Sequence, residues 1–282
     1  MPKIFFLKTY KVGSSTLAGI LRGLGDKYEK ITLTPPNDHI LMLGHEDFEK
    51  VIKLQNITDG KVDIICNHIR EYRSSLIDRF LGPNYFKITI ARHPVQRTLS
   101  GFYFSRTKPF CSFSVWEWIE KCPSFQNGIY LSTLDKDKQS HGSIEQILKR
   151  FDLVMVTERY SESLIVLMWK LGLNIIDLLH ISSKKGIRND TLTSDEYEFF
   201  VNQSLKNNQR DLELFEVANE LLDAHIAKLQ PKNLEQNKMI LEKMIQDIEV
   251  ACPFSNQDCY WRDNGCQRTC LKNWIATNIQ CF

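Results

Sequence analysis

Residues 5–21 read FFLKTYKVGSSTLAGIL, and this stretch decides the fold because an apolar run passes through a short polar loop into a helical pattern. Residues 3–8 predict a buried strand, since their apolar run is short, continuous and followed by a glycine-containing loop. Residues 15–28 predict a helix, because apolar side chains recur there at helical spacing. These side chains are Leu17, Ile20, Leu21 and Leu24. A strand followed at once by a helix is typical of parallel sheets.

The same alternation continues through the first part of the chain. Further strands are predicted at residues 62–66, 85–91 and 151–157, where apolar and β-branched side chains gather. Helices are predicted around 74–80, from Pro94 onward, and from a Ser161 cap to Leu171. We therefore expect an α/β fold with a P-loop-like parallel sheet flanked by helices.

Beyond residue 190 the pattern changes to long helices and then to a cysteine-rich end. Residues 194–230 and 233–249 are rich in Glu, Lys, Leu and Gln and show no strand pattern, which is typical of long helices. We expect an α/β core at 1–190, a helical segment packed on that core at 191–250, and a cysteine-rich tail at 251–282.

The cysteines favour an oxidising compartment, with reduced thiols as the alternative. Five of the eight cysteines fall in the tail, and a dense terminal cluster is typical of disulfides. A zinc site is not expected, since no Cys-x-x-Cys pair occurs and the tail has no His. Cys66, in a predicted strand, is expected to be a buried free thiol. The cysteines expected in disulfides are Cys252, Cys259, Cys266 and Cys270, and the remaining tail cysteine is free or pairs with Cys111 or Cys122.

Charge and hydropathy exclude some classes of function. The 36 basic and 34 acidic side chains leave a net charge of +2, so no nucleic acid partner is expected. Neither a secretory signal nor an apolar run of membrane-spanning length is recognisable. Because the cysteines point to a lumenal compartment, we expect any membrane contact to come from an anchor that this chain lacks. The glycosylation sequons at Asn56, Asn189 and Asn202 are about as frequent as chance predicts.

The loop at residues 8–16 is suited to an anion. A glycine and small hydroxyl residues between a strand and a helix let backbone N–H groups approach a phosphate, and the helix dipole adds to the attraction. Lys8 and Lys11 add positive charge, but both precede Gly13, so the loop is not a Walker A sequence. The alternative is an ordinary helix cap with two surface lysines. The residues expected to bind the anion are Lys8, Thr9, Lys11, Val12, Gly13, Ser14, Ser15 and Thr16.

Two other strand ends carry candidate site residues. Arg92 follows the strand predicted at 85–91, where α/β sheets bind ligands, and its guanidinium fork suits a phosphate. Ser100 follows about two helical turns later, so its hydroxyl can reach the same anion. His68 follows the strand predicted at 62–66 and is a candidate general base, because imidazole titrates in the useful range. The alternatives are an ordinary strand-end Arg and a hydrogen-bonded structural His.

Weaker candidates lie in loops and in aromatic clusters. His39 and His45 fall in a loop-rich stretch that could border an acceptor. A basic loop follows a predicted strand and could close on a ligand, although such charge runs are more often solvated surface. It contains Lys184, Lys185, Gly186 and Arg188. Aromatic side chains that could stack on a ring, but more often form core, are Trp116, Trp118, Phe102, Tyr103 and Phe104.

Together, the loop at 8–16 and the Arg92–Ser100 pair resemble the donor-binding segments of sulfotransferases that use 3′-phosphoadenosine 5′-phosphosulfate (PAPS). Within that family, residues 5–21 are similar to the galactose-3-O-sulfotransferase branch, with the heparan sulfate 2-O-sulfotransferases as more distant relatives. IICNHIR at 64–70 and FDLVMVTERYSESLIVLMWKLG at 151–172 resemble the same branch. The resemblance covers residues 3–230 by order and spacing. His93 departs from it, because that branch usually has an acidic residue before the Pro.

The resemblance implies a role for each candidate. The loop would hold the 5′-phosphosulfate, with Lys11 near the bridging oxygen and Lys8 beside the sulfonate, while Arg92 and Ser100 hold the 3′-phosphate. His68 would be the base for the acceptor hydroxyl, and no metal would be required. The implied reaction moves the sulfuryl group from PAPS to a sugar hydroxyl, the 3-hydroxyl of galactose on a glycolipid or glycoprotein, in the Golgi lumen or at its membrane. The alternatives are a nucleotide-dependent kinase and a non-catalytic carbohydrate-binding protein.

Overall fold

A computed structural model of the chain describes residues 1–33, 45–57, 59–69, 74–106, 113–121, 129–134, 143–182, 192–229, 231–253 and 267–279. Several candidates named above lie outside these residues. They are His39, Cys111, Cys122, Lys184, Lys185, Gly186, Arg188, Asn189, Cys259, Cys266 and the remaining tail cysteine, Cys281.

Five parallel strands form one sheet in the order β2-β3-β1-β4-β5, which confirms the predicted α/β class with a parallel sheet. β1 lies at the centre, paired with β3 on one side and with β4 on the other. Because the strands are parallel, the segments that follow β3, β1 and β4 begin at the same edge of the sheet. The strands are β1 (Ile4–Phe6), β2 (Thr32–Leu33), β3 (Ile64–Ile65), β4 (Phe86–Ala91) and β5 (Leu153–Val156).

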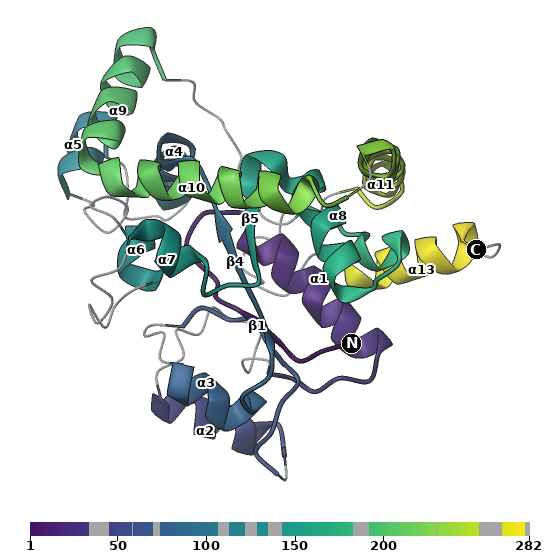
Figure 1. Cartoon of the computed structure of the whole chain (residues 1–282). Coiled ribbons are helices and arrows are strands. Elements are labelled where there is room, and N and C mark those ends of the chain that lie inside the picture. The colour runs from purple at the N-terminus through teal and green to yellow at the C-terminus, as the bar shows by residue number, and fades with distance from the viewer. Residues whose placement is uncertain are drawn as a thin grey trace.

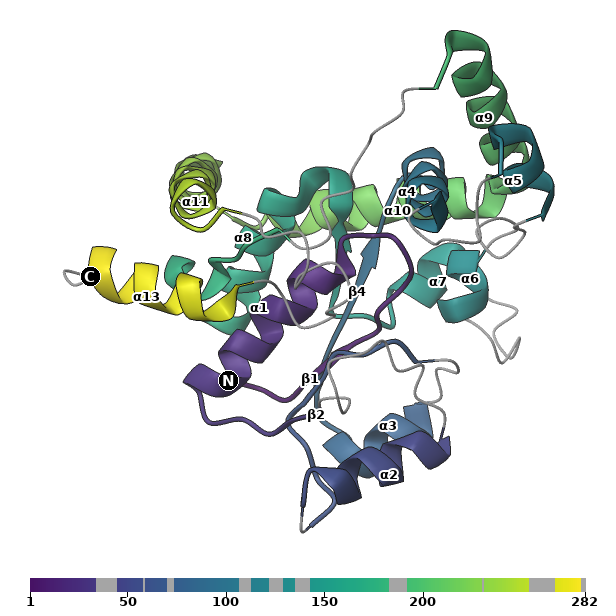
Figure 2. The same ribbon diagram turned by 180° about the vertical axis from the view of Figure 1, so that it is seen from behind.

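Helices flank the sheet and extend beyond it (Figure 1). Figure 1 shows α2 and α3 together at one end of the molecule and α5 and α9 together at the other, and Figure 2 shows α13 beside α1. The first eight are α1 (Ser14–Lys27), α2 (His45–Leu54), α3 (Ser74–Leu81), α4 (Pro94–Arg106), α5 (Val115–Lys121), α6 (Ile129–Leu134), α7 (Ile144–Leu148) and α8 (Tyr160–Leu171). The others are α9 (Ser194–Asn207), α10 (Gln209–Ile226), α11 (Pro231–Ala251) and α13 (Arg268–Asn278), with 3₁₀ helices η3 (Thr157–Arg159) and η4 (Ile175–Leu178) on either side of α8.

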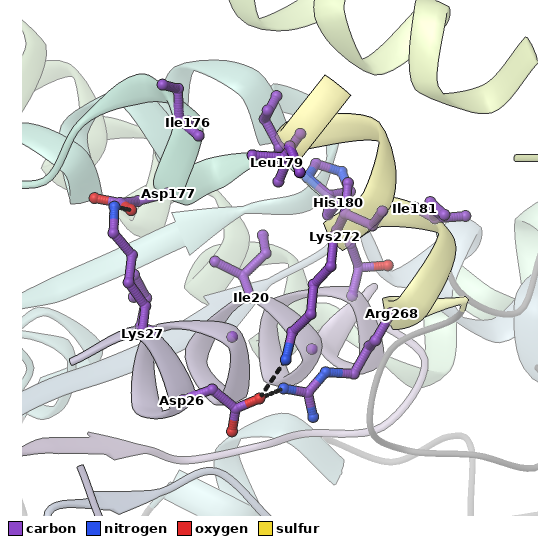
Figure 3. Close-up of a pocket in the computed structure, with 17 residues that line it drawn as sticks. Ile20, Asp26, Lys27, Ile176, Asp177, Leu179, His180, Ile181, Arg268 and Lys272 are labelled. Atoms are coloured by element: carbon purple, nitrogen blue, oxygen red, sulfur yellow. Dashed lines mark hydrogen bonds and ion pairs between the residues drawn. The ribbon is translucent and has the colours of Figure 1, made fainter. Parts of the chain in front are cut away.

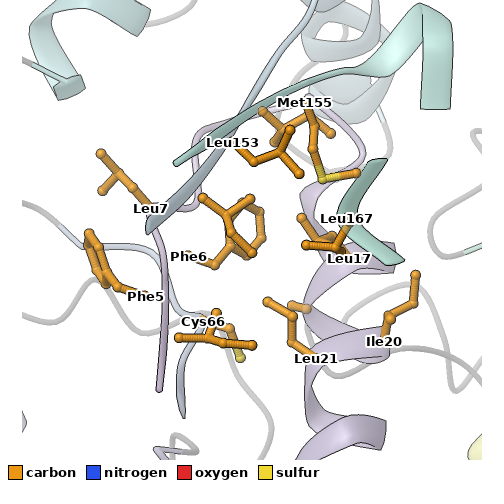
Figure 4. Packing of buried hydrophobic residues seen from close by; sticks show 14 of the residues in the cluster. Phe5, Phe6, Leu7, Leu17, Ile20, Leu21, Cys66, Leu153, Met155 and Leu167 are labelled. Atoms are coloured by element: carbon orange, nitrogen blue, oxygen red, sulfur yellow. The ribbon is translucent and has the colours of Figure 1, made fainter. Parts of the chain in front are cut away.

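The main hydrophobic core joins the sheet to the helices on its faces. Phe6 of β1 is completely buried, and Figure 4 shows Leu17 and Leu21 on the side of α1 that faces this strand. The core also includes Leu214 and Leu222 of α10, which packs against β5. Helix α1, which follows β1, is therefore held in place along its length by buried apolar contacts.

A second, smaller hydrophobic cluster joins α4, α5 and α9. Phe102, Trp118 and Phe200 meet there, and none of the three side chains has exposed surface. Phe102 and Trp118 are therefore core residues, and they cannot stack on a bound sugar or adenine. Trp116 is 44% exposed and its ring lies 3.8 Å from that of Phe199.

Three local expectations differ from the structure. The predicted Ser161 cap is wrong, because a 3₁₀ turn at Thr157–Arg159 runs directly into α8, and Arg159 is the N-cap. The strand expected before residue 184 is instead η4, which starts at an Asn174–Asp177 capping box. The strand predicted at 62–66 is shorter in the structure. It is β3, which covers only two residues and pairs with the equally short β2.

The cysteine-rich end is described in part. Cys252 and Cys270 form a disulfide, and Cys66 is a buried free thiol, as predicted for all three. The disulfide joins the segment after α11 to the first turn of α13. In the part of the chain that the structure describes, no helix is long and apolar enough to cross a membrane.

Candidate active site

The candidate site lies where β3, β1 and β4 end. Beyond the regular ladder, Lys8 and His68 still pair as an isolated parallel bridge. The structure thereby places the start of the basic loop beside the candidate base, although 60 residues separate them in sequence. Arg92, which follows β4, donates a hydrogen bond from Nη1 to the carbonyl oxygen of Lys11, 2.9 Å away. Three predicted parts of the site are thus neighbours.

The loop between β1 and α1 has an unusual backbone. Lys11 has φ +60° and Gly13 has φ +75°, both in the left-handed region. A left-handed conformation costs an L-residue such as Lys roughly 1–2 kcal/mol, whereas glycine adopts it readily. An added Cβ at Gly13 would meet Thr157 and Tyr160 at ordinary contact distances of 3.7 and 3.8 Å. Backbone conformation, not lack of space, therefore requires glycine at this position.

The carbonyl oxygens of this loop are bound by side chains of the protein. Ser14 Oγ donates to the Thr9 carbonyl at 3.0 Å. Thr157 Oγ1 donates to the Val12 carbonyl at 2.7 Å, and the Lys11 carbonyl accepts from Arg92. These bonds direct negative ends of the peptide dipoles into the protein. A loop that turns its carbonyl oxygens inward is better suited to an anion, because an exposed carbonyl would repel it.

The N-terminus of α1 adds to this electrostatic preference. Gly13 is the N-cap, and Ser14, Ser15 and Thr16 form the buried first turn. No acidic side chain lies in that turn, so its partial positive charge is not neutralised from within the helix. Small hydroxyl residues at a helix N-terminus are typical of phosphate-binding sites.

The two lysines of the loop lie in different surroundings. Lys8 is 1% exposed, at the end of the central strand. Lys11 is partly exposed, and its ammonium lies 3.9 Å from the centroid of the Phe104 ring. A cation above an aromatic ring is attracted by the ring quadrupole. Phe104 therefore helps to position the Lys11 ammonium.

His68 is held in a defined orientation and tautomer. Its ring stacks on Tyr10, with centroids 4.6 Å apart, and its Nδ1 lies 3.1 Å from the carbonyl oxygen of Lys8. A carbonyl oxygen only accepts, so Nδ1 carries the proton and Nε2 carries the lone pair of the neutral ring. That tautomer can take a proton at Nε2.

The strand end that carries His68 is also fixed through its neighbour, Asn67. The Asn67 amide accepts from Arg22 Nη2 at 2.9 Å and donates to the carbonyl oxygen of Leu33 at 2.9 Å. Asn67 thus continues the connection from β3 to β2 beyond the last ladder pair. With Lys8 on the other side, the backbone at His68 is attached to both neighbouring strands.

Comparisons with known proteins show what this chain is similar to. Residues 1–115 match the family model described as galactose-3-O-sulfotransferase. That match contains the loop, His68, Arg92 and Ser100. The predicted resemblance to this family is confirmed.

Curated members of the family are similar over a larger part of the chain. Galactose-3-O-sulfotransferase 2 of Mus musculus is 23% identical over 68% of this chain and 54% of its own length. Galactosylceramide sulfotransferase is 29% identical in Bos taurus, over 63% of this chain and 47% of its own length, and 30% identical in Mus musculus, over 67% and 49%. The chain therefore spans about half the length of the curated relatives it matches.

Arg92 and Ser100 are the residues expected to bind the 3′-phosphate. Of the two, Arg92 is connected to the loop by a hydrogen bond. The Arg92 side chain is 20% exposed and its Nε lies 4.0 Å from Glu158 Oε1. The same carboxylate accepts from the backbone N–H of His93 at 3.0 Å. Glu158 of η3 thus places a carboxylate beside the position before Pro94, where this sequence has His93. Ser100 is partly exposed on α4, and no hydrogen bond joins its hydroxyl to another described residue.

Sequence reasoning missed the residues that support the site. Thr157 and Glu158, after β5, hold the loop and Arg92. Tyr10 and Phe104 contact His68 and Lys11. Thr157 could have been suggested by its place at the end of a predicted strand, but the two ring contacts depend on tertiary packing.

The remaining candidates add nothing to the described site. His45 begins α2, at the opposite end of the molecule from α5 and α9 (Figure 1), and its side chain is outside the description. Among the described residues, no group of three or more His, Cys, Asp or Glu could hold a metal ion.

Proposed function

We propose that this chain is a PAPS-dependent carbohydrate sulfotransferase, which transfers the sulfuryl group to the 3-hydroxyl of a galactose. The observation that carries the proposal is the Lys8–His68 bridge, which joins an anion-suited loop to an imidazole of the correct tautomer. The match to the galactose-3-O-sulfotransferase family model supports the sugar acceptor. The relatives named for galactosylceramide favour a glycolipid, and a glycoprotein glycan is the other acceptor of the same chemistry.

The donor is proposed to bind across the ends of β1 and β4. The loop at 8–16 would hold the 5′-phosphosulfate, because its carbonyl oxygens are turned away and its helix N-terminus and lysines are positive. Arg92 would bind the 3′-phosphate together with Ser100, whose hydroxyl can donate a hydrogen bond. Arg92 would also couple the two ends of the donor, since it already holds the Lys11 carbonyl.

In the proposed reaction His68 accepts the proton of the acceptor hydroxyl at Nε2. The hydroxyl oxygen then forms a bond to sulfur as the bond from sulfur to the bridging oxygen breaks. Adenosine 3′,5′-bisphosphate leaves with the electron pair of that bond. Lys11 stabilises the negative charge that develops on the bridging oxygen, and Lys8 stabilises the sulfonate. Positioning and electrostatics supply the rate enhancement, as in phosphoryl transfer.

A ligand-binding experiment tests the donor assignment. Adenosine 3′,5′-bisphosphate at about 100 times its dissociation constant should stabilise the fold by roughly 2.7 kcal/mol, measured by thermal unfolding in EDTA. Arg92→Ala should reduce the shift, because the 3′-phosphate contact is lost. Mg-ATP is the control. A shift with Mg-ATP and none with the bisphosphate would support the nucleotide-dependent kinase instead.

A kinetic experiment tests the base. His68→Gln should lower turnover by about 10²–10⁴-fold, the usual effect of general-base catalysis, and leave bisphosphate affinity unchanged. Lys11→Ala should damage both turnover and donor binding, since its charge acts on the ground state and the transition state. Loss of donor affinity in His68→Gln would show that the imidazole only supports the loop. Near-normal turnover under saturating acceptor would remove His68 from the mechanism.

A further inference from the structure

A cavity of about 370 Å³ lies on the outer side of α1, away from the sheet. Its walls are α1, the segment 176–181 and the C-terminal helix α13 (Figure 3). The volume is within the usual range of small-molecule sites, roughly 300–1,000 Å³. The cavity shares only Thr16 with the loop at 8–16, so it is separate from the proposed donor and acceptor positions.

The interior of the cavity is apolar. Ile20 and Leu179 point into it in Figure 3, and Leu271 and Ile275 of α13 line the opposite wall. His180 also lines it, and burial lowers the pKa of this imidazole, which favours the neutral ring. Such a lining is suited to hydrocarbon.

Glycines open the cavity along α1. Gly19 and Gly23 are four residues apart, hence on one face of the helix, and both line the cavity. A Cβ added at Gly23 would meet no atom within 4 Å. Glycine in a helix interior lowers helix stability relative to alanine, and here it leaves an empty strip beside the backbone.

Among the residues that the structure describes, the mouth of the cavity carries a surplus of positive charge. Arg268 and Lys272, one turn apart on α13, both contact the single carboxylate of Asp26 (Figure 3). Lys27 forms an ion pair with Asp177, so that pair is neutral. Two cations on one carboxylate leave one positive charge for a ligand, and a second carboxylate would complete the arrangement.

We propose that this cavity binds a free fatty-acid-like anion, with a medium-length alkyl chain inside and its carboxylate at Arg268 and Lys272. The apolar walls match the chain, and the surplus charge at the mouth matches the head group. The wall that α13 provides can adjust to a ligand, because none of its described side chains is buried. The Cys252–Cys270 disulfide keeps this helix at the cavity.

Calorimetric titration with decanoate, below its micelle concentration, tests the proposal. Wild type should bind one decanoate saturably. Gly23→Leu fills the strip beside α1 and should weaken binding by at least about tenfold, which is 1.4 kcal/mol. Ala276→Phe fills the cavity from α13 and should weaken binding in the same way. It replaces Gly23→Leu in the test if that variant does not fold. Lys206→Leu, which adds a leucine at an exposed site on α9, should bind as wild type does.

The head group is tested with a matched ligand pair. The double variant Arg268→Gln/Lys272→Gln should lose decanoate affinity and keep its affinity for decan-1-ol, which has the same chain and no charge. Absence of saturable binding to wild type, or binding that survives both cavity-filling variants, would overturn the proposal. Decanoate binding does not require sulfuryl transfer. Thermal stabilisation by adenosine 3′,5′-bisphosphate is measured separately on the same proteins, so failure of the cavity proposal can be told apart from failure of the donor assignment.

Discussion

At the scale of single residues, the backbone of Lys11 and Gly13 is the most demanding feature of the site. Both lie in the left-handed region, and side chains from two other strand ends hold the intervening carbonyl groups. An L-residue keeps such a conformation only when its surroundings over-determine it, and this occurs preferentially where ligands bind. The strain at Lys11 is therefore consistent with its proposed role at the transferred group.

Substitution of two glycines separates backbone strain from packing. Gly13→Ala should lower the free energy of unfolding by about 1–2 kcal/mol and weaken bisphosphate binding, because alanine disfavours φ +75° although its Cβ has room. Gly23→Ala is the matched control, since it lies in regular helix beside open space and should raise stability by about 0.5–1 kcal/mol. Urea unfolding measures both. Equal stability of the two variants would mean that the loop relaxes out of the left-handed conformation.

Sequence reasoning identified the candidate site residues but not the contacts among them. Lys8, Lys11, His68 and Arg92 were recognisable because polar side chains directly follow apolar strands, and parallel strands end at one edge. Nothing local indicates that Nδ1 of His68 binds the Lys8 carbonyl, because the pair depends on the order of β3 and β1 in the sheet. The stacking of Tyr10 was hidden for the same reason.

At the scale of elements, strong periodicity predicted the helices well, and short strands were difficult. α3 and α4 begin at Ser74 and Pro94, where the sequence predicted them, because apolar spacing and Pro at the first position are local signals. β2 is only two residues long and exists through its pairing with β3, so no pattern of its own announces it. η4 was mistaken for a strand since its apolar run is too short to show a period.

At the same scale, the disulfide should determine whether α13 stays folded against the molecule. It closes a separation of 18 residues, and a loop of that length corresponds to about 3 kcal/mol in the chain-entropy model. Cys270→Ala should therefore loosen α13, since its described side chains are at most partly buried. Hydrogen exchange should show loss of protection in 268–278 and unchanged protection in β1 and β4. Cys66→Ala, which removes a thiol without a disulfide, is the control, and protection of α13 in both variants would contradict the expectation.

At the scale of the whole molecule, a buried ion pair ties α10 to α4, the helix that follows β4. Arg97 of α4 donates to Asp211 of α10 at 2.7 Å and to Asn208 at 2.9 Å, and the Arg97 and Asp211 side chains are 1% and 0% exposed. Asp211 also accepts from the backbone N–H of Leu131 in α6. Three elements therefore meet at one carboxylate.

Removing one partner of this pair should destabilise the molecule as a whole. Arg97→Ala should cost about 3–5 kcal/mol, because it leaves the Asp211 charge buried and unpaired. The double variant Arg97→Met/Asp211→Leu should recover most of that loss, measured by urea unfolding as a double-mutant cycle. Lys243→Ala breaks an exposed pair with Asp247 and should cost less than about 1 kcal/mol. A biphasic urea transition in Arg97→Ala alone would show that α10 unfolds separately from the sheet.

The hydrogen bond from Thr157 to the Val12 carbonyl has a consequence for biosynthesis. The loop at 8–16 is translated before β5, and one of its supports follows Val12 by 145 residues. Contacts this distant in sequence require closure of long chain loops, which is slow and gains nothing until the partners meet. A nascent chain that ends before β5 should therefore lack nucleotide affinity even when β1, β3 and β4 have emerged. The ability to bind a donor would then arise late and abruptly during synthesis, once the strand that carries Thr157 has joined the sheet.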